Sequence, residues 1–176
     1  MRYFYCLVGV PQIICFLLFK NKIVEIKEDL IKYSGGGNLK RFISQLPKKE
    51  YRNVFYYRLP FTLRHLLNIT LPRVNTCSLQ VAEIGGGMKI HHGYSSIVCA
   101  EKVGRNFQFY QNVTVGWGKN GKPTIGDNVS IYTGAVVAGQ INIGNNVRIA
   151  ANSVVRQDIP NNSLVYGNPC VIRTIE

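Results

Sequence analysis

Acidic residues are scarce in this chain. Only 9 of its 176 residues are Asp or Glu, against 21 Lys and Arg, so the formal net charge is +12. Residues 1–75 hold 13 basic and 4 acidic side chains, and the remaining residues hold 8 and 5. A basic segment of this kind is attracted to anionic membrane surfaces, acidic polymers or phosphorylated ligands. No nucleic-acid-binding motif accompanies the charge, so we do not expect nucleic acid as a partner.

The cysteine pattern argues against two structural roles. The five cysteines are odd in number and form no Cys-x-x-Cys pair. This pattern does not favour a disulfide framework or a structural zinc site, and a reducing cytoplasm is the expected location.

One long uncharged run lies near the start of the chain, at residues 3–19. As a helix it would reach only about 25 Å at ~1.5 Å per residue, against a bilayer core of ~30 Å. Pro11 interrupts the run and no small-residue cleavage site follows it, which does not fit a cleaved signal peptide. Three interpretations stay open: an interfacial anchor, a helix packed on a partner subunit, and a transmembrane span.

The rest of the first 75 residues favours helices. Apolar residues recur at helical spacing, and Gly or Pro residues separate the segments. We expect helices at residues 21–33, 39–46, 51–59 and 63–69. The third segment is rich in aromatics and arginines and is interpreted as a packed helix face. His65 is expected on a helix face among leucines.

A six-residue repeat dominates the second half of the chain. Aliphatic residues recur every six positions, and small or apolar residues recur four places after each of them. The first series is Ile125, Ile131, Val137, Ile143, Ile149 and Val155. A period of six fits neither an α-helix nor a plain amphipathic strand. It predicts short strands and turns that wind into a parallel β-helix, with the repeating residues in a narrow core.

The repeat also extends backward with two interruptions. Ile84 and Ile90 are six apart, the spacing then slips to seven at Ile97, and it returns to six through Val103, Phe109 and Val115. A spacing of ten separates Val115 from Ile125, so four residues are expected to bulge out around residues 118–123. Insertions in a solenoid often mark the ligand-binding face. Residues 166–169 have the atypical pattern of a final, capping coil.

His91 and His92 form the only histidine pair, beside the first interruption. Their side chains are expected on opposite sides of the strand. A histidine is suited to removing a proton from a hydroxyl near neutral pH. Zinc would need about three imidazoles converging from different coils, so no metal site is expected. Gly116 follows 24 residues after His92, about one 18-residue coil along. Two interpretations stay open: its backbone approaches a ligand closely, or the glycine serves only the turn.

These motifs resemble those of left-handed β-helix acyltransferases, within them the serine acetyltransferase-like group. The matching segments are residues 84–85, 90–92, 112–116, 125–129, 151–155 and 167–169. The resemblance implies a mainly β, left-handed parallel β-helix of hexapeptide repeats at residues 76–176. A helical, basic and partly apolar region at residues 1–75 would precede it.

The resemblance also implies a homotrimer whose active sites lie between subunits, with acetyl-CoA as co-substrate. It gives His92 the role of general base. The expected acetyl-CoA contacts are Gly116, Trp117, Thr133, Ala151 and Arg156, and the expected acceptor contacts are His91, Tyr94 and Lys122.

The chain departs from the family pattern where free serine would bind. Enzymes that acetylate serine carry aspartates at the positions of His91 and Cys77 and an Arg-His pair before the Pro-x-Ile motif, all replaced here. What orients His92 is then open, with Glu101 or a backbone carbonyl as alternatives. Residues 51–58 resemble the lead-in of short enzymes of capsule and exopolysaccharide assembly. We therefore expect a sugar or glycan acceptor, with peripheral contact of the N-terminal region with the inner membrane face.

Three functions remain in view beside a metal-dependent hydratase. The first is an O-acetyltransferase that moves acetyl from acetyl-CoA to a hydroxyl of a sugar or polysaccharide precursor. The second is a serine O-acetyltransferase with altered acceptor contacts. The third is a non-catalytic β-helix scaffold, because fold alone does not fix function.

Overall fold

The structure is a computed structural model that describes residues 5 and 7–175. The chain forms two compact units. Residues 1–75 and 86–89 make up the helical unit, and residues 76–85 and 90–176 make up the β-helical unit. Each unit is described by itself below.

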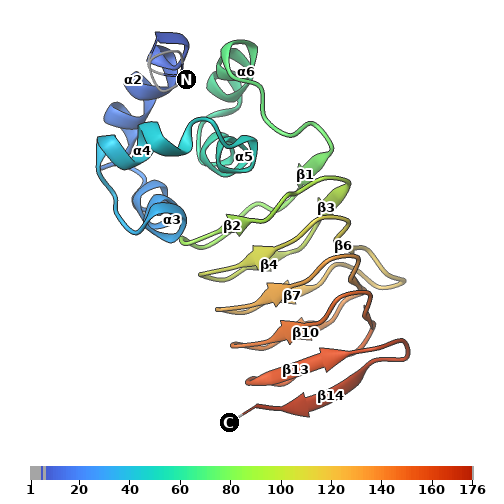
Figure 1. Ribbon diagram of the computed structural model, residues 1–176. Coiled ribbons are helices and arrows are strands. Elements are labelled where there is room, and N and C mark those ends of the chain that lie inside the picture. Colours follow the sequence, from blue (N-terminus) through green and yellow to red (C-terminus); the bar gives the residue numbers. More distant parts are fainter. Residues whose placement is uncertain (1–4, 6, 176) are drawn as a thin grey trace. The chain divides into compact units, whose positions relative to one another are not determined.

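The helical unit contains five labelled helices (Figure 1). They are α2 (Val10–Phe19), α3 (Val24–Ser34), α4 (Leu39–Gln45), α5 (Lys49–Tyr57) and α6 (Phe61–Thr70). The four helices predicted after residue 20 are confirmed, with small shifts at their ends. Pro11 lies in the first turn of α2, where its missing N–H leaves no helical hydrogen bond unmade. Within the described residues, none of the helices has both the length and the apolarity needed to cross a bilayer.

Aromatic rings and buried polar groups form the core of this unit. Phe42 stacks on Phe16 with ring centroids 4.2 Å apart and meets Phe55 edge-on at 5.0 Å. The Arg58 guanidinium bonds the Asp29 carboxylate at 2.8 Å, and both side chains are buried. The predicted packed face of α5 is therefore confirmed, but Arg58 lies inside the unit rather than with its charged head in water.

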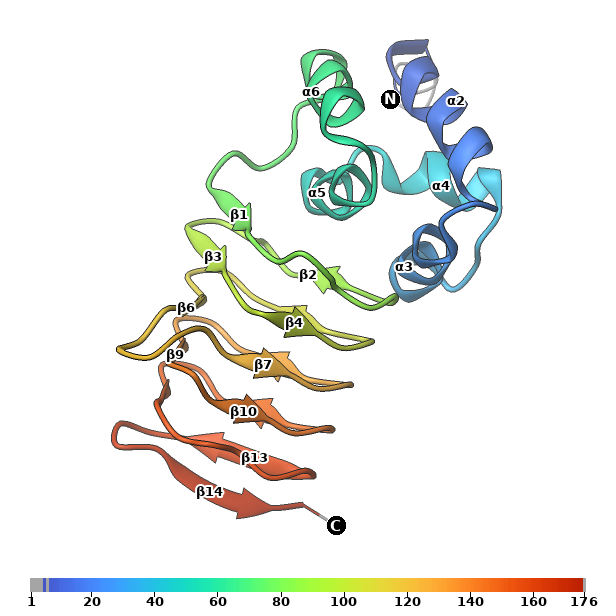
Figure 2. The same cartoon turned by 180° about the vertical axis from the view of Figure 1, so that it is seen from behind.

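The β-helical unit consists of short strands in three sheets (Figures 1 and 2). The first sheet holds β1 (Cys77–Leu79), β3 (Ser96–Val98), β6 (Thr114–Gly116), β9 (Val136–Ala138) and β12 (Val154–Val155). The second holds β4 (Lys102–Val103), β7 (Thr124–Ile125) and β10 (Asn142–Ile143). The third holds β2 (Lys89–Ile90), β5 (Gln108–Phe109), β8 (Ser130–Ile131), β11 (Arg148–Ile149), β13 (Ser163–Tyr166) and β14 (Val171–Thr174).

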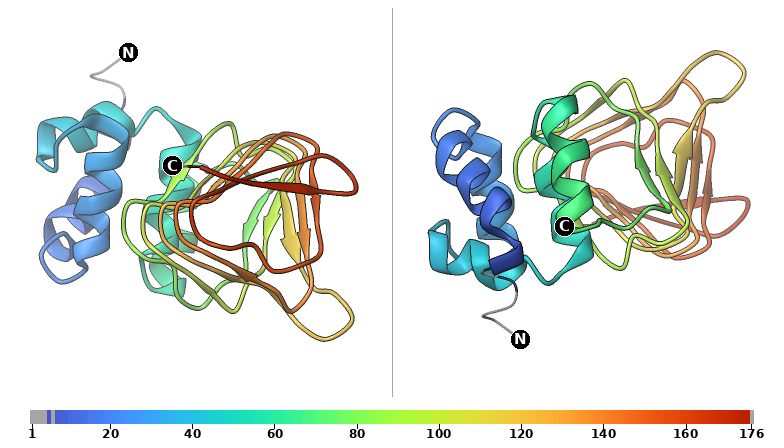
Figure 3. Two further views of the ribbon diagram at one scale, coloured as in Figure 1. Left: turned by 90° about the horizontal axis from the view of Figure 1, so that it is seen from below. Right: turned by 90° about the horizontal axis from the view of Figure 1, so that it is seen from above.

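Successive coils pair in parallel, and among the strand pairs of the described residues only β13 with β14 is antiparallel. Viewed along its axis in Figure 3, the solenoid is three-sided, and the yellow-orange loop that includes residues 118–123 projects from one corner. The predicted fold, a left-handed parallel β-helix preceded by a helical region, is confirmed.

The six-residue repeat lines the core as predicted. Every member of the series from Ile125 to Val155 is at most 3% exposed. The backward extension is wrong at one position: Ile97 is 46% exposed, whereas Val98 is fully buried and pairs with Val115. The extra residues of the turn at 93–96 therefore move the core position from Ile97 to Val98. A shift of one residue in a strand turns its side chain to the opposite face.

Candidate active site

Each turn between two sheets stacks on the equivalent turn of the next coil, so the solenoid has three corners. The turn from the third sheet to the first carries four residues that we call the histidine corner: His92, Gln111, Thr133 and Ala151. Backbone bonds fix this column. His91 N–H donates to the carbonyl of Phe109 at 2.8 Å, and Tyr110 N–H donates to that of Ile131 at 3.1 Å. The residues that follow, His92, Gln111 and Thr133, are therefore in register.

His92 is exposed and has a backbone φ of 64°, in the left-handed region. Only a few per cent of residues other than glycine adopt this conformation, and Asn, Asp and His are enriched among them. At the same corner the left-handed residue of the next coils is Asn112, Gly134 or Asn152. Within the described chain, no side-chain partner holds the His92 imidazole, so it can turn toward a ligand.

His91 points to a different environment, as its position in the strand predicts. Its ring is half-buried and stacks on Tyr110 with centroids 4.3 Å apart, and Tyr110 stacks on Tyr132 at 5.0 Å. His91 Nε2 also lies 3.3 Å from Gln108 Oε1. His91 was expected to contact the acetyl acceptor. In that role its ring would already be packed against Tyr110 of the third sheet.

Gln111 was not among the predicted site residues. It lies directly below His92 in the next coil, and its Oε1 atom is buried without a hydrogen-bond partner among the described residues. A buried acceptor left unpaired costs about 1–3 kcal/mol, which is a reason to expect that a ligand or another side chain completes it. Gln111 lies 19 residues after His92, one more than the 18 residues of a regular coil. Sequence spacing alone therefore does not align the two residues, and the register of the two coils is needed to do so.

The turn from the first sheet to the second forms the glycine corner: Gly116, Ala138 and Arg156. Gly116 pairs with Ala138, and Arg156 follows Val155, which pairs with Val137. A Cβ atom added at Gly116 would meet nothing within 4 Å. Gly116 thus borders open space, as expected of a backbone that a ligand approaches.

The extruded loop begins at this glycine corner. Trp117 is 66% exposed, and the Lys122 ammonium lies over its ring, 5.2 Å from the centroid. Lys122 also lies 3.6 Å from a carboxylate oxygen of Glu101. Glu101 therefore forms an ion pair with Lys122. The described residues show no contact that supports Glu101 as the group that orients His92.

The predicted site residues fall into two groups within one chain. His92, Thr133 and Ala151 lie at the histidine corner, together with the exposed Tyr94. Gly116, Trp117, Lys122 and Arg156 lie at or beside the glycine corner. The corners are at opposite ends of the first sheet, whose strands of two or three residues span up to roughly 10 Å. The structure does not bring His92 and Gly116 together in a single copy.

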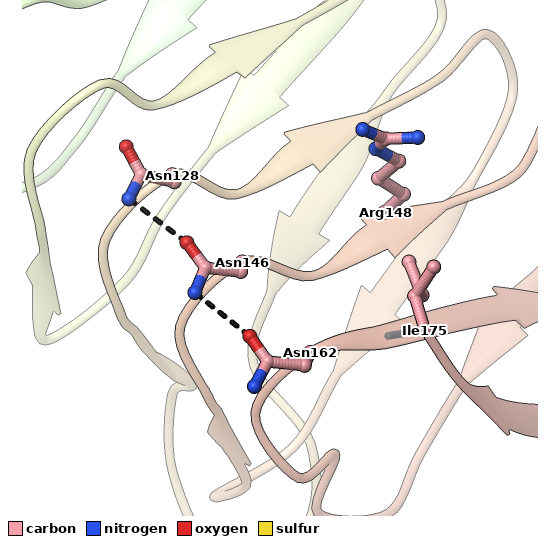
Figure 4. Close-up of a pocket in the computed structure, with 5 residues that line it drawn as sticks. All are labelled: Asn128, Asn146, Arg148, Asn162 and Ile175. Atoms are coloured by element: carbon pink, nitrogen blue, oxygen red, sulfur yellow. Dashed lines mark hydrogen bonds between the residues drawn. The ribbon is translucent and has the colours of Figure 1, made fainter.

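The third corner holds a cavity of about 310 Å³ and none of the predicted residues (Figure 4). Asn128, Asn146, Arg148, Asn162 and Ile175 line it. The asparagine side chains bond one another from coil to coil at 2.9 and 2.8 Å, and each asparagine is left-handed. This ladder of asparagine side chains follows from the geometry of the turns, because each asparagine occupies the left-handed position of its turn. Among the described residues, no group of three or more His, Cys, Asp or Glu side chains is placed to hold a metal ion.

Comparison with known proteins adds the family context. The bacterial transferase hexapeptide family, of six repeats, matches residues 122–157. Residues 122–157 are therefore similar to the repeats of this family. A serine acetyltransferase of Staphylococcus aureus is 47% identical over 95 residues, which cover 50% of this chain and 44% of that protein. One from Synechococcus elongatus is 38% identical over 121 residues, which cover 66% of this chain and 50% of that protein. The chain spans about half the length of these curated relatives.

Solved structures give the same result for the fold. The serine acetyltransferase of Neisseria gonorrhoeae in complex with serine has a TM-score of 0.67 at 26% identity, covering 92% of this chain and 73% of that one. That of Vibrio cholerae has a TM-score of 0.69 at 22% identity, covering 86% and 66%. These relatives are serine acetyltransferases, so the finer resemblance to capsule and exopolysaccharide enzymes remains a prediction.

Proposed function

We propose that this hexapeptide-repeat protein is an acyltransferase that moves an acetyl group from acetyl-CoA to a hydroxyl. The observation that carries the proposal is an exposed histidine, His92, which has no side-chain partner among the described residues and lies in a strained turn of a β-helix homologous to serine acetyltransferases. Glycine or asparagine would adopt this left-handed backbone conformation at a lower cost, and strain of this kind clusters at functional sites.

His92 acts as the general base in this proposal. Its imidazole takes the proton of the acceptor hydroxyl as the hydroxyl oxygen bonds to the thioester carbonyl carbon. The carbon–sulfur bond breaks, and the proton passes from His92 to the departing thiolate of CoA. Gly116 contributes by leaving space for the thioester end beside its backbone, because it has no side chain to block the approach.

A second copy of the chain completes the site. His92 and Gly116 lie at different corners, so the base of one copy would meet the glycine corner of its neighbour. A cyclic assembly makes this contact repeatedly and closes on itself, and we propose the homotrimer that the family resemblance implies. Thr133 and Ala151 below His92, and Arg156 beyond Gly116, would then line the two walls of one groove for acetyl-CoA.

L-serine is the first candidate acceptor, because the relatives are named serine acetyltransferases. A sugar hydroxyl is the second candidate, and His91 is the observation that favours it. In place of an acid at this position the chain has an imidazole stacked on Tyr110, which offers no carboxylate to an ammonium group.

An acceptor panel tests the proposal and separates the candidates. Release of CoA thiol from acetyl-CoA would be followed with L-serine, hexoses, N-acetylhexosamines and short oligosaccharides. Acceleration by serine alone supports the first candidate, and acceleration by a sugar alone supports the second. If calorimetry finds no binding of CoA, the protein is a scaffold and the proposed function is wrong.

A further inference from the structure

A row of exposed apolar side chains runs along helix α2 and the residues just before it. We call it the α2 ridge. Its members and their exposed fractions are Leu7 at 77%, Val10 at 47%, Ile14 at 51%, Leu17 at 46% and Leu18 at 60%. Steps of three or four residues place them on one side of a helix.

The opposite side of α2 fixes the helix to its unit. Gln12, Cys15 and Phe16 are buried, and the Gln12 amide donates to the Tyr56 hydroxyl at 2.9 Å and to the Leu67 carbonyl at 3.0 Å. The α2 ridge therefore cannot turn inward without breaking these bonds. Exposed apolar rows of this size on a soluble unit mark interaction sites.

The charge of the helical unit indicates the partner. The exposed charged residues of the helical unit within the described chain are all basic: Lys22, Lys40, Arg41, Lys48 and Lys49. Its acidic residues, such as Asp29 paired with Arg58, are buried or half-buried. An apolar row combined with exposed basic residues matches an anionic lipid surface, where each signal alone would bind weakly.

We propose that the α2 ridge docks the helical unit on an anionic bilayer surface. Helix α2 has 10 residues and reaches about 15 Å, half of the ~30 Å hydrocarbon core, so it lies in the interface without crossing. Lys22, which is exposed just after the helix, would then contact the headgroups. This placement would bring the enzyme to acceptors or partners at the membrane, and it does not depend on which acceptor is used.

Vesicle co-sedimentation with the full chain tests the docking. The protein should pellet with vesicles of phosphatidylcholine and phosphatidylserine, should pellet less as salt rises, and should stay in solution with phosphatidylcholine alone. A double variant, Ile14→Glu with Leu18→Glu, should lower the partition coefficient at least about a hundredfold, since each change removes one bilayer-facing side chain.

A matched control uses α6, on the same unit. Leu66 is 61% exposed, close to the 60% of Leu18, and Leu66→Glu should leave vesicle binding unchanged. Circular dichroism should show all variants folded. Equal loss in the Leu66 variant, or no binding by the unaltered protein, overturns the proposal. So does a lower oligomer mass by light scattering for the double variant without any vesicle binding, because the ridge would then contact a second copy.

Discussion

Replacing Gly116 by alanine separates the fold of this protein from its proposed chemistry. Gly116 ends strand β6 with an ordinary backbone conformation, and a new Cβ would meet no atom within 4 Å. The methyl group would therefore be added to open space on the solenoid surface, where the proposed groove passes.

The expected magnitudes have opposite signs for stability and activity. Replacing glycine by alanine at a compatible position stabilises a protein by about 0.4–1 kcal/mol, because the unfolded chain loses freedom. In the groove the same methyl would take the place of the thioester end. A loss of roughly 1.4–3 kcal/mol of binding would raise KM for acetyl-CoA about ten- to a hundredfold.

Thermal unfolding and steady-state release of CoA thiol measure both quantities on one preparation. Gly126→Ala is the matched control, because its Cβ would lie 2.5 Å from Asn145 Oδ1 and 2.9 Å from the carbonyl carbon of Gly144. That variant should unfold at a lower temperature, with KM for acetyl-CoA little changed. An unchanged KM in Gly116→Ala would show that the proposed path of acetyl-CoA does not pass Gly116.

Three further predictions follow from burial and hydrogen bonding. Ile131→Ala should lower the free energy of unfolding by about 2–5 kcal/mol in denaturant titration, whereas Ile97→Ala should cost less than about 1 kcal/mol, because only Ile131 is fully buried. Burial raises the pKa of Tyr56 to about 12, so its contribution to stability should be complete below about pH 10 and decline as pH rises toward 12. Tyr56→Phe should make that alkaline slope of the unfolding free energy shallower, and an unchanged slope would contradict the assignment. Gln111→Met should lower kcat about tenfold while the unfolding temperature stays level or rises, since it removes a buried, unpaired oxygen; an unaltered kcat would leave Gln111 without a role in the reaction.

The sequence predicts the coil of the solenoid better than its corners. A strict period from Ile125 to Val155 fixes which side chains enter the core, because one residue type recurs at one place in each turn. The period fails where the turn at residues 93–96 lengthens, and there Ile97 was placed in the core in error. The helices were predictable for the same reason, because apolar residues recur at helical spacing, and Pro and Gly mark the helix ends.

The site was less predictable, because it depends on register across coils. Spacing along the chain correctly places Gly116 about one coil from His92. It does not reveal that the two residues lie at different corners of the solenoid. Gln111 was missed although it lies under His92. Only the backbone bonds between coils, such as that from Gly134 N–H to the Gln111 carbonyl at 3.2 Å, define these columns.

The most direct test of the account compares the protein with its His92→Asn variant in acceptor-dependent release of CoA thiol. Asparagine suits the left-handed backbone at this position, as Asn112 and Asn152 show at the same corner, so the fold and the binding of CoA should persist. The account predicts that kcat falls by about 10²–10⁴-fold, the usual contribution of a general base, and that the unfolding temperature hardly changes. Turnover that survives at the level of the unaltered protein would contradict the assignment of His92 as the base.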